Sequence, residues 1–246
     1  KGSRTPGHPE YKHTHGVEIT TGPLGQGIAT AVGMAIAENF LAAKFNRNEL
    51  SIVDHYTYVL CGDGDLQEGI AAEAMSLAGH LALKKLIVLY DSNDIQLDGE
   101  VHAANTENTK GKVEAMGWNY LLVEDGSDCD QIDVAIEEAK KSQKPTIVEI
   151  KTVIGHGAPN AGESSVHGKP LSADEVAQLR KNLEYDTAPF EIKDSVYLYY
   201  KKNVIERGEA VNAVWNSLLS QYETKYPTEY QELLRLQKQY NDIDYK

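Results

Sequence analysis

Short apolar runs alternate with longer stretches of helical spacing along most of the chain. Strands are predicted at Tyr56–Cys61, Leu86–Tyr90, Asn119–Val123 and Thr146–Ile150. Helices are predicted at Pro23–Phe45, Glu68–Leu83 and Cys129–Ser142. This alternation indicates βαβ units, and hence an α/β fold with a mostly parallel sheet flanked by helices.

The rest of the chain has a different pattern. Four glycines and two prolines fall between Thr152 and Pro170, too many for a regular element, and a loop this long in a compact domain is typically functional or mobile. Ser172 then has the features of an N-cap for a helix that runs to about Leu183. Beyond it, Gly208–Tyr240 has amphipathic helical spacing, which predicts a helical C-terminal extension.

Two polar residues stand at the ends of neighbouring predicted strands. Asp63 lies in a Gly-Asp-Gly turn after the first strand, and Asn93 follows the second. Because the carboxyl ends of parallel strands share one edge of the sheet, we expect the two side chains to meet where ligands bind. Carboxylate and amide oxygens suit a hard cation, Mg²⁺ or Ca²⁺, with further oxygens from water, phosphate or a backbone carbonyl such as that of Ile95. An Asp-Gly pair alone is more often an ordinary turn, so Asn93 is what favours a metal site.

Glycines and histidines in loops add candidate ligand contacts. Gly62 and Gly64 lack Cβ atoms, which lets a bulky diphosphate approach the backbone closely. His8 and His167, each beside a glycine, are candidate donors to phosphate or hydroxyl groups, or proton carriers near pH 7. Solvation at the surface is the ordinary alternative for both. Two further histidines near His8 lack the neighbouring cysteines or second pair of a zinc site, so zinc is not favoured.

Glu68 and Glu73 lie on one predicted helix. Exposure to solvent is the usual state of helix carboxylates. The alanines around Glu73 instead indicate packing against another surface, where a carboxylate could cross a subunit interface.

Charge and cysteine content narrow the class of protein. The formal net charge of −13 and the sequence pI of about 5.0 disfavour nucleic acid and anionic membranes as partners. Two cysteines in 246 residues fit a reducing, cytoplasmic compartment rather than a disulfide framework. No run of consecutive apolar residues approaches the length of a membrane span, and no signal peptide is visible. The opening has no initiator Met, so we expect the natural protein to begin earlier.

The order and spacing of four segments resemble transketolase. They are Gly-His-Pro-Glu at 7–10, Thr-Thr-Gly-Pro-Leu-Gly-Gln-Gly at 20–27, Gly-Asp-Gly-Asp-Leu-Gln-Glu-Gly at 62–69 and Ser-Ser-Val-His-Gly at 164–168. The resemblance runs over nearly the whole chain, and the second and third segments together are typical of transketolases. It implies a thiamine diphosphate-binding fold and a transferase that moves a two-carbon ketol unit from a ketose phosphate to an aldose phosphate in the pentose phosphate pathway.

The resemblance also implies which residues hold the cation and the cofactor. The ligands of Mg²⁺ or Ca²⁺ would be Asp63, Asn93 and the backbone carbonyl of Ile95. The cofactor-binding residues would be Gly22, Leu24, Gly62, Asp63, Gly64, Asn93, Ile154 and His167. Gly62, Gly64 and His167 would lie along the diphosphate. Gly22 and Leu24 would lie near the aminopyrimidine.

Catalytic and interface roles follow from the same resemblance. His8 would donate to the hydroxyls of the donor sugar, and His167 would be a second catalytic histidine. Glu68 and Glu73 would belong to a relay of carboxylates between the two active sites of a homodimer. Sugar phosphates would be the substrates.

By this resemblance the chain holds only part of an enzyme. Residues 1–190 would form the diphosphate- and metal-binding domain without its opening segment, and residues 191–246 a helical linker toward an absent pyrimidine-binding domain. That domain carries the Glu that activates the cofactor, so we expect this chain alone to be inactive. The alternatives are a related thiamine enzyme, such as a dihydroxyacetone synthase or a split transketolase subunit, and a non-catalytic binding or interface module.

Overall fold

The computed structural model of the chain describes residues 6–241, which divide into two compact units. The first unit comprises the described residues up to Ile36 together with Tyr56–Leu183. The second comprises Ala37–His55 and the described residues from Glu184 onward. Helix α1 (Gln26–Phe45) contributes its first part to the first unit and its second part to the other.

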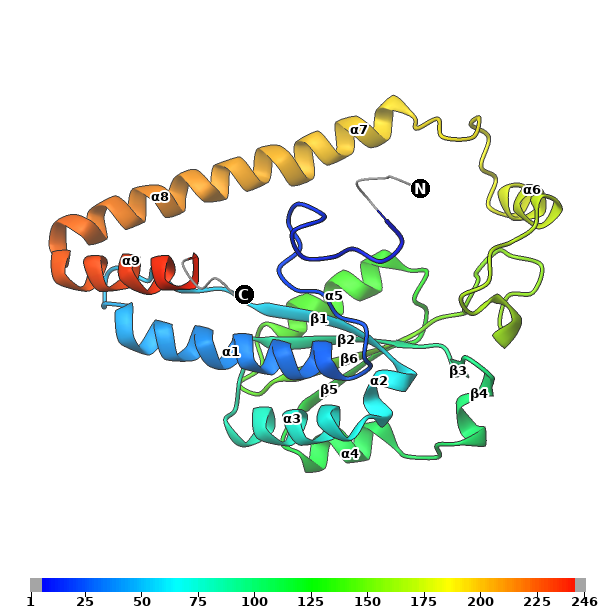
Figure 1. Cartoon of the computed structure of the whole chain (residues 1–246), viewed down its shortest axis with the longest axis horizontal. Helices are drawn as coiled ribbons and strands as arrows, with labels where there is room; N and C mark the ends of the chain where they lie inside the picture. The colour runs from blue at the N-terminus through cyan, green and yellow to red at the C-terminus, as the bar shows by residue number, and fades with distance from the viewer. Residues whose placement is uncertain (1–5, 242–246) are drawn as a thin grey trace. The chain divides into compact units, whose positions relative to one another are not determined.

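A four-stranded sheet forms the centre of the first unit. Its strands are β1 (Thr57–Gly62), β2 (Leu86–Ser92), β5 (Asn119–Val123) and β6 (Thr146–Lys151). They lie in the order β1-β2-β6-β5, and every neighbouring pair is parallel (Figure 1). The central strands β2 and β6 are buried along most of their length, as their apolar runs require. The prediction of a parallel α/β sheet built from these four runs is confirmed.

Helices from three parts of the chain pack on one face of this sheet. They are the first part of α1, α3 (Gly69–His80) and α4 (Thr109–Ala115), and they share one apolar core with β2. Trp118 is buried in that core and donates its indole N–H to the carbonyl of Met75 at 2.8 Å. The backbone of α3 comes so close here that a Cβ on Gly79 would lie 1.8 Å from a carbonyl oxygen, so only glycine fits.

The opposite face of the sheet is covered by α5 (Cys129–Ala139). Ala139 of this helix is fully buried against a cluster that includes Ile87 and Val148. Because helices cover both faces, the carboxyl edge of the sheet is where ligands have access, as in other open α/β sheets (Figure 1).

Two predicted helices differ from expectation. Helix α1 begins later than predicted, at Gln26, because Gly25 before it has a left-handed backbone with φ of +77°. The predicted helix Glu68–Leu83 is instead α2 (Asp63–Gln67) followed by α3. Glu68 between them is extended, with φ of −71° and ψ of 137°, and therefore breaks the helix.

The loops carry a few short elements. They are the antiparallel hairpin β3 (Ile95–Gln96) and β4 (Gly99–Glu100), and the 3₁₀ turns Val101–Ala103 and Ser164–Val166. The second turn lies in the glycine-rich segment, which otherwise has no regular element among the described residues. Helix α6 (Ala173–Asn182) follows, and Ser172 caps it by accepting a hydrogen bond from the backbone N–H of Glu175.

The predicted helical extension is present in the second unit, but it is not one amphipathic helix. Its elements are α7 (Asp194–Tyr200), a π-helical stretch (Lys201–Glu206), α8 (Arg207–Lys225) and α9 (Pro227–Asn241). The predicted helix Gly208–Tyr240 is wrong in its continuity, because it breaks at Tyr226. Pro227 has no N–H to donate, and it disfavours a helical backbone in the residue before it.

Helix α1 is the one helix within residues 6–241 whose length and apolar composition would allow it to cross a membrane. In this structure part of its apolar residues belong to protein cores, whereas Met34 and Phe40 are exposed. Ile28 and Val32 are buried in the first unit. Phe45 is buried in the second, where its carbonyl accepts a hydrogen bond from the Tyr222 hydroxyl at 2.7 Å. Such packing is typical of a core helix, and the absence of a membrane partner stays a prediction.

Candidate functional site

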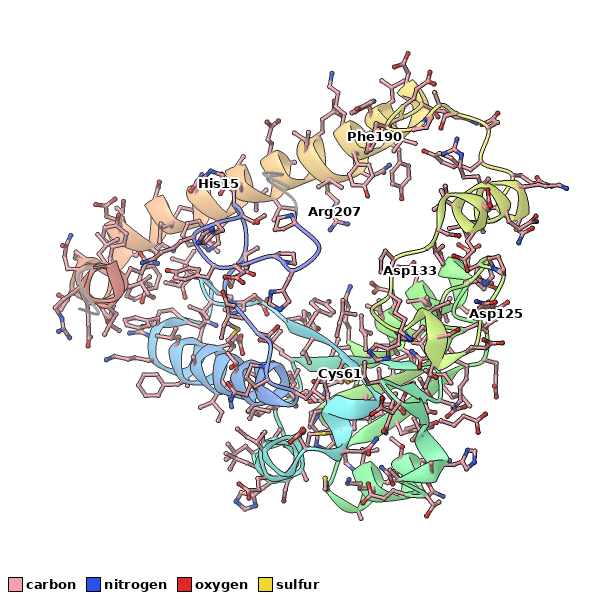
Figure 2. The ribbon with its side chains drawn as sticks, turned by 45° about the vertical axis from the view of Figure 1, so that its right-hand side comes forward. His15, Cys61, Asp125, Asp133, Phe190 and Arg207 are labelled. Carbon is pink, nitrogen blue, oxygen red and sulfur yellow. The ribbon has the colours of Figure 1, made fainter. Side chains whose placement is uncertain are left out.

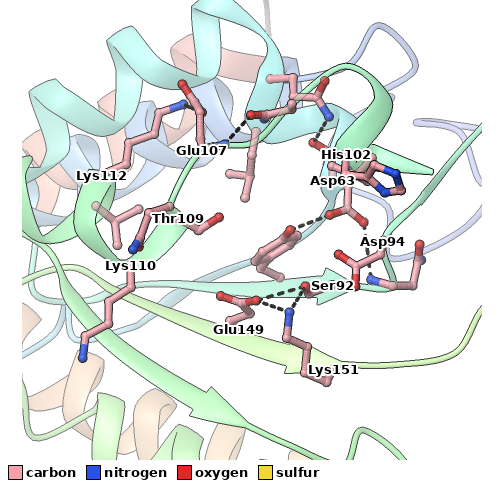
Figure 3. Close-up of a pocket in the computed structure, with 18 of the residues that line it drawn as sticks. Asp63, Ser92, Asp94, His102, Glu107, Thr109, Lys110, Lys112, Glu149 and Lys151 are labelled. Atoms are coloured by element: carbon pink, nitrogen blue, oxygen red, sulfur yellow. Dashed lines mark hydrogen bonds and ion pairs between the residues drawn. The ribbon is translucent and has the colours of Figure 1, made fainter.

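Asp63 and Asn93 come together at the carboxyl edge of the sheet. The register of β1 against β2 sets Gly62 beside Asp91, so the residues that follow each strand are neighbours. The backbone N–H of Asn93 donates to Asp63 Oδ2 at 3.3 Å (Figure 3). The side chain of Asp63 is buried although it begins a helix on the rim of the sheet. The two residues are therefore neighbours, joined through the backbone of Asn93, and the shared role of their side chains stays a prediction.

The environment of Asp63 is polar and includes further carboxylates. Burial raises the pKa of the Asp63 carboxyl, and the carboxylates of Asp94 and Asp91 raise it further. Hydrogen bonds from the Tyr90 hydroxyl, at 2.5 Å from Oδ1, and from the Asn93 N–H oppose this rise without cancelling it. A cation beside the carboxylate would favour its ionised form, so the arrangement suits cation binding.

Asn93 is held in place by a local turn. Its Oδ1 accepts a hydrogen bond from the backbone N–H of Ile95 at 3.0 Å, and Asp94 between them has a left-handed backbone. An amide oxygen has two lone pairs, so this contact leaves one for a ligand. No group of three or more His, Cys, Asp or Glu residues arranged for a metal ion occurs within the described chain. A cation here would therefore depend on amide, backbone and non-protein oxygens, as Mg²⁺ and Ca²⁺ often do.

The two glycine-rich turns lie against each other. A Cβ on Gly64 would come within 3.0 Å of Leu24 Cδ1, which shows that Leu24 packs over the turn after β1. Cβ atoms on Gly62 or Gly22 would meet nothing within 4 Å. Open space therefore adjoins the backbone of both turns, and a bulky group can approach them.

Cys61, labelled in Figure 2, precedes this turn at the end of β1. The side chain is buried, and burial raises the pKa of its thiol. A thiol with a raised pKa is a poor nucleophile, so the site has no reactive cysteine at this position.

His167 and Ile154 belong to the glycine-rich segment after β6. The His167 Nδ1 is shielded from solvent and has no hydrogen-bond partner in the described structure. Ile154 accepts a hydrogen bond from the N–H of Gly162 at 2.9 Å, which closes the loop on itself. A shielded imidazole nitrogen without a partner is costly, so His167 has an unmet requirement that a polar ligand would satisfy.

The other candidate residues lie outside this cluster of contacts. His8 is in an exposed loop, where its Nδ1 faces Glu10 Oε1 at 3.6 Å. Glu68 is the exposed residue between α2 and α3, and Glu73 is exposed on α3. The roles predicted for these three residues stay predictions.

A polar network beside the site was not anticipated from the sequence. Lys151 Nζ lies 2.6 Å from Glu149 Oε1 and donates to Ser92 Oγ at 2.9 Å (Figure 3). Tyr120 donates to Glu149 Oε2 at 2.8 Å. These residues, with Asp63 and Tyr90, border a cavity of about 700 Å³. The sequence feature that could have indicated this network is the presence of two charged residues, Glu149 and Lys151, in the mostly apolar strand β6.

Comparisons with known proteins give one consistent result. The sequence model of a family described as "Transketolase, thiamine diphosphate binding domain" matches residues 1–241. A transketolase of Staphylococcus epidermidis is 55% identical over 230 residues, which cover 92% of this chain and 34% of the relative. The structure of transketolase from Leishmania mexicana superposes with a TM-score of 0.91 at 46% identity, over 95% of this chain and 35% of that one.

A Pichia stipitis transketolase solved in complex with sedoheptulose-7-phosphate also superposes with a TM-score of 0.91, at 43% identity. This match covers 95% of the present chain and 35% of that protein. The chain therefore spans about a third of the length of the relatives it matches.

Proposed function

The chain belongs to the transketolase family, whose thiamine diphosphate-binding domain it matches, and from this premise we propose that it binds thiamine diphosphate with a divalent cation. In a protein of full length it would serve the transfer of a two-carbon ketol unit from a ketose phosphate to an aldose phosphate, as in the pentose phosphate pathway. The observation that carries the proposal is the contact between the buried Asp63 and Asn93 at the carboxyl edge of the sheet.

The cation would be held by oxygens that differ in kind. Asp63 supplies a carboxylate, Asn93 an amide oxygen and Ile95 a backbone carbonyl. Three protein ligands leave room for oxygens of a diphosphate and water, which suits Mg²⁺ or Ca²⁺. The acidic residues around Asp63 support this assignment, because a cation would offset their repulsion.

The cofactor would lie between the glycine-rich turns. The open space beside Gly62 fits a diphosphate, and the unpartnered Nδ1 of His167 fits a contact with it. Gly64, over which Leu24 packs, would also lie along the diphosphate. Gly22 and Leu24 would border the aminopyrimidine, and Ile154 would pack against the cofactor. Thiamine diphosphate supplies the carbanion chemistry when bound, while the protein binds and orients it.

The substrates would be sugar phosphates. The relative solved with sedoheptulose-7-phosphate supports this class, because its sequence and fold are close to those of the present chain. His8 lies in an exposed loop that a substrate can reach, and we assign it to the sugar hydroxyls. His167 is assigned to catalysis as well as to cofactor binding.

We propose a homodimer in which Glu68 and Glu73 lie at the interface. Exposed Ile70 and Leu77 on the same helix as Glu73 support this, because such apolar side chains gain from being covered. Residues 1–190 would bind cofactor and metal, residues 191–246 would be a linker, and the protein would be cytoplasmic.

The test is an assay of two-carbon transfer by the protein of full length that carries this chain. We expect turnover of a ketose phosphate with an aldose phosphate, dependent on both thiamine diphosphate and a divalent cation. The 246-residue chain alone should show no turnover. Cofactor binding without turnover in the full-length protein would favour the alternative of a non-catalytic module.

A further inference from the structure

Asp65 directly follows the Gly62–Gly64 turn. Its carboxylate accepts two backbone hydrogen bonds, one from a residue 40 positions earlier in the chain and one from a residue three positions earlier. Oδ1 accepts from the N–H of Gly25 at 2.8 Å, and Oδ2 accepts from the N–H of Gly62 at 2.9 Å. One side chain thus joins the segment before α1 to the end of β1.

The contact with Gly25 satisfies a group that would otherwise be costly. Gly25 is buried, so its N–H needs a partner inside the protein. It directly precedes α1, a helix of 20 residues, whose first N–H groups carry partial positive charge. A carboxylate is the strongest acceptor available to such a group, because a charged hydrogen bond is about twice as strong as a neutral one.

The same segment is packed tightly against the start of α3. A Cβ on Gly25 would lie 2.8 Å from Glu68 Cβ and 3.0 Å from Ile70 Cγ2, and the backbone there is left-handed. Leu24 meanwhile packs over Gly64. The 22–25 segment is therefore fixed at several points, and Asp65 adds a polar contact that links it to both Gly62 and α2.

We propose that Asp65 is a positioning residue that sets the distance between the 22–25 segment and the Gly62–Gly64 turn. Its importance for cofactor binding rests on the proposed function, which assigns these two segments to opposite ends of thiamine diphosphate. Without the carboxylate, the Gly25 N–H loses its partner and the segment is held to the turn by packing alone.

The first arm of the test measures hydrogen exchange of single backbone amides in the 246-residue chain by NMR. In Asp65→Ala the amide of Gly25 should exchange at least about tenfold faster, the expected effect of losing a hydrogen bond to a charged group. Amides of the core strands, such as that of Val88, should keep their wild-type rates, which separates a local release from general destabilisation. The control is Asp130→Ala, which removes an exposed carboxylate from the first turn of α5.

The second arm measures the thiamine diphosphate affinity of the full-length protein by calorimetry in the presence of Mg²⁺. Asp65→Ala should weaken binding about tenfold, whereas Asp130→Ala should not change it. If Asp65→Ala fails to fold, the isosteric Asp65→Asn keeps the packing. Its single acceptor oxygen can serve only one of the two amides, so it should still accelerate exchange at Gly25 or Gly62.

Unchanged exchange at Gly25 in Asp65→Ala would show that Asp65 does not hold the 22–25 segment. Faster exchange with unchanged cofactor affinity would overturn the positioning role. A wild-type full-length protein that binds no cofactor in the second arm would contradict the proposed function instead. In that case the exchange arm would still decide whether Asp65 holds the segment.

Discussion

The Tyr90 hydroxyl donates a 2.5 Å hydrogen bond to Oδ1 of Asp63, inside the protein and at the edge where ligands have access. Tyr90 is the fifth residue of β2 and pairs in register with Cys61 of β1, so the sheet itself aims the phenol at the carboxylate. Burial raises the pKa of the Tyr90 hydroxyl, and the contact with Asp63 raises it further, so the phenol remains a donor. The side chain of Asp63 is thereby fixed from within the core.

Removing this donor should weaken cation binding without removing a ligand. In Tyr90→Phe we expect metal-dependent cofactor affinity to fall about 10- to 100-fold, the usual cost of losing a residue that orients a metal ligand. Calorimetric titration checks this. The control is Tyr56→Phe, which loses a hydroxyl bonded to the carbonyl of Lys140 away from the site. Equal affinities for Tyr90→Phe and wild type would show that Asp63 does not need this support.

His8 is predicted to act on the substrate and not on the cofactor. In the full-length protein, His8→Ala should lower the rate of ketol transfer about a hundredfold or more, because a donor to developing negative charge acts in the transition state. Thiamine diphosphate affinity should be unchanged. His13→Ala, at an exposed position in the same loop, is the matched control. A normal rate in His8→Ala would show that His8 is only a solvated loop residue. Lost cofactor binding would instead indicate that His8 contacts the diphosphate.

The Glu149–Lys151 pair should make stability depend on acidic pH. Burial alone would raise the pKa of Glu149, but hydrogen bonds from Lys151 and Tyr120 and the charge of Lys151 outweigh burial and lower it below 4.5. A lowered pKa contributes stability that is present above the unfolded value and is lost as pH falls through the folded value.

For the variant Glu149→Gln we expect a loss of about 2 kcal/mol in the free energy of unfolding at pH 7, and a smaller loss as the pH falls below 4.5. Denaturant unfolding at several pH values measures this. Glu137→Gln, in the exposed pair with Lys140, should cost less than about 0.5 kcal/mol at any of them. A pH-independent loss for Glu149→Gln would indicate that packing, not charge, sets the effect.

The elements that could be predicted from the sequence are those whose signal lies within a few consecutive residues. The apolar run of β2 and the Asn93 that ends it predict both a strand and its place at the sheet edge. Helix α2 has five residues, too few for a periodic pattern, and only its extended neighbour Glu68 marks its end. The contact between Asp65 and Gly25 joins residues 40 positions apart, so no local pattern could indicate it.

In the candidate site, too, only the residues with a local sequence signal could be predicted. Asp63 and Asn93 could be predicted as ligand residues because each is a polar residue that follows an apolar run. Tyr90 and Glu149 are instead strand residues whose orientation depends on register across the sheet. Pro227 shows the opposite case, a local signal strong enough to break a helix that amphipathic spacing alone would continue.

We propose that Asp63 and Asn93 hold a divalent cation on thiamine diphosphate. The most direct measurement is calorimetric titration of the cofactor into the full-length protein, with and without Mg²⁺, for wild type and Asp63→Ala. Asp133→Ala, an exposed position on α5 labelled in Figure 2, is the control. We predict Mg²⁺-dependent binding in wild type and in the control, and no Mg²⁺-dependent binding in Asp63→Ala. Unchanged cofactor affinity in Asp63→Ala would contradict the account, because the residue on which the site is built would then not be a ligand.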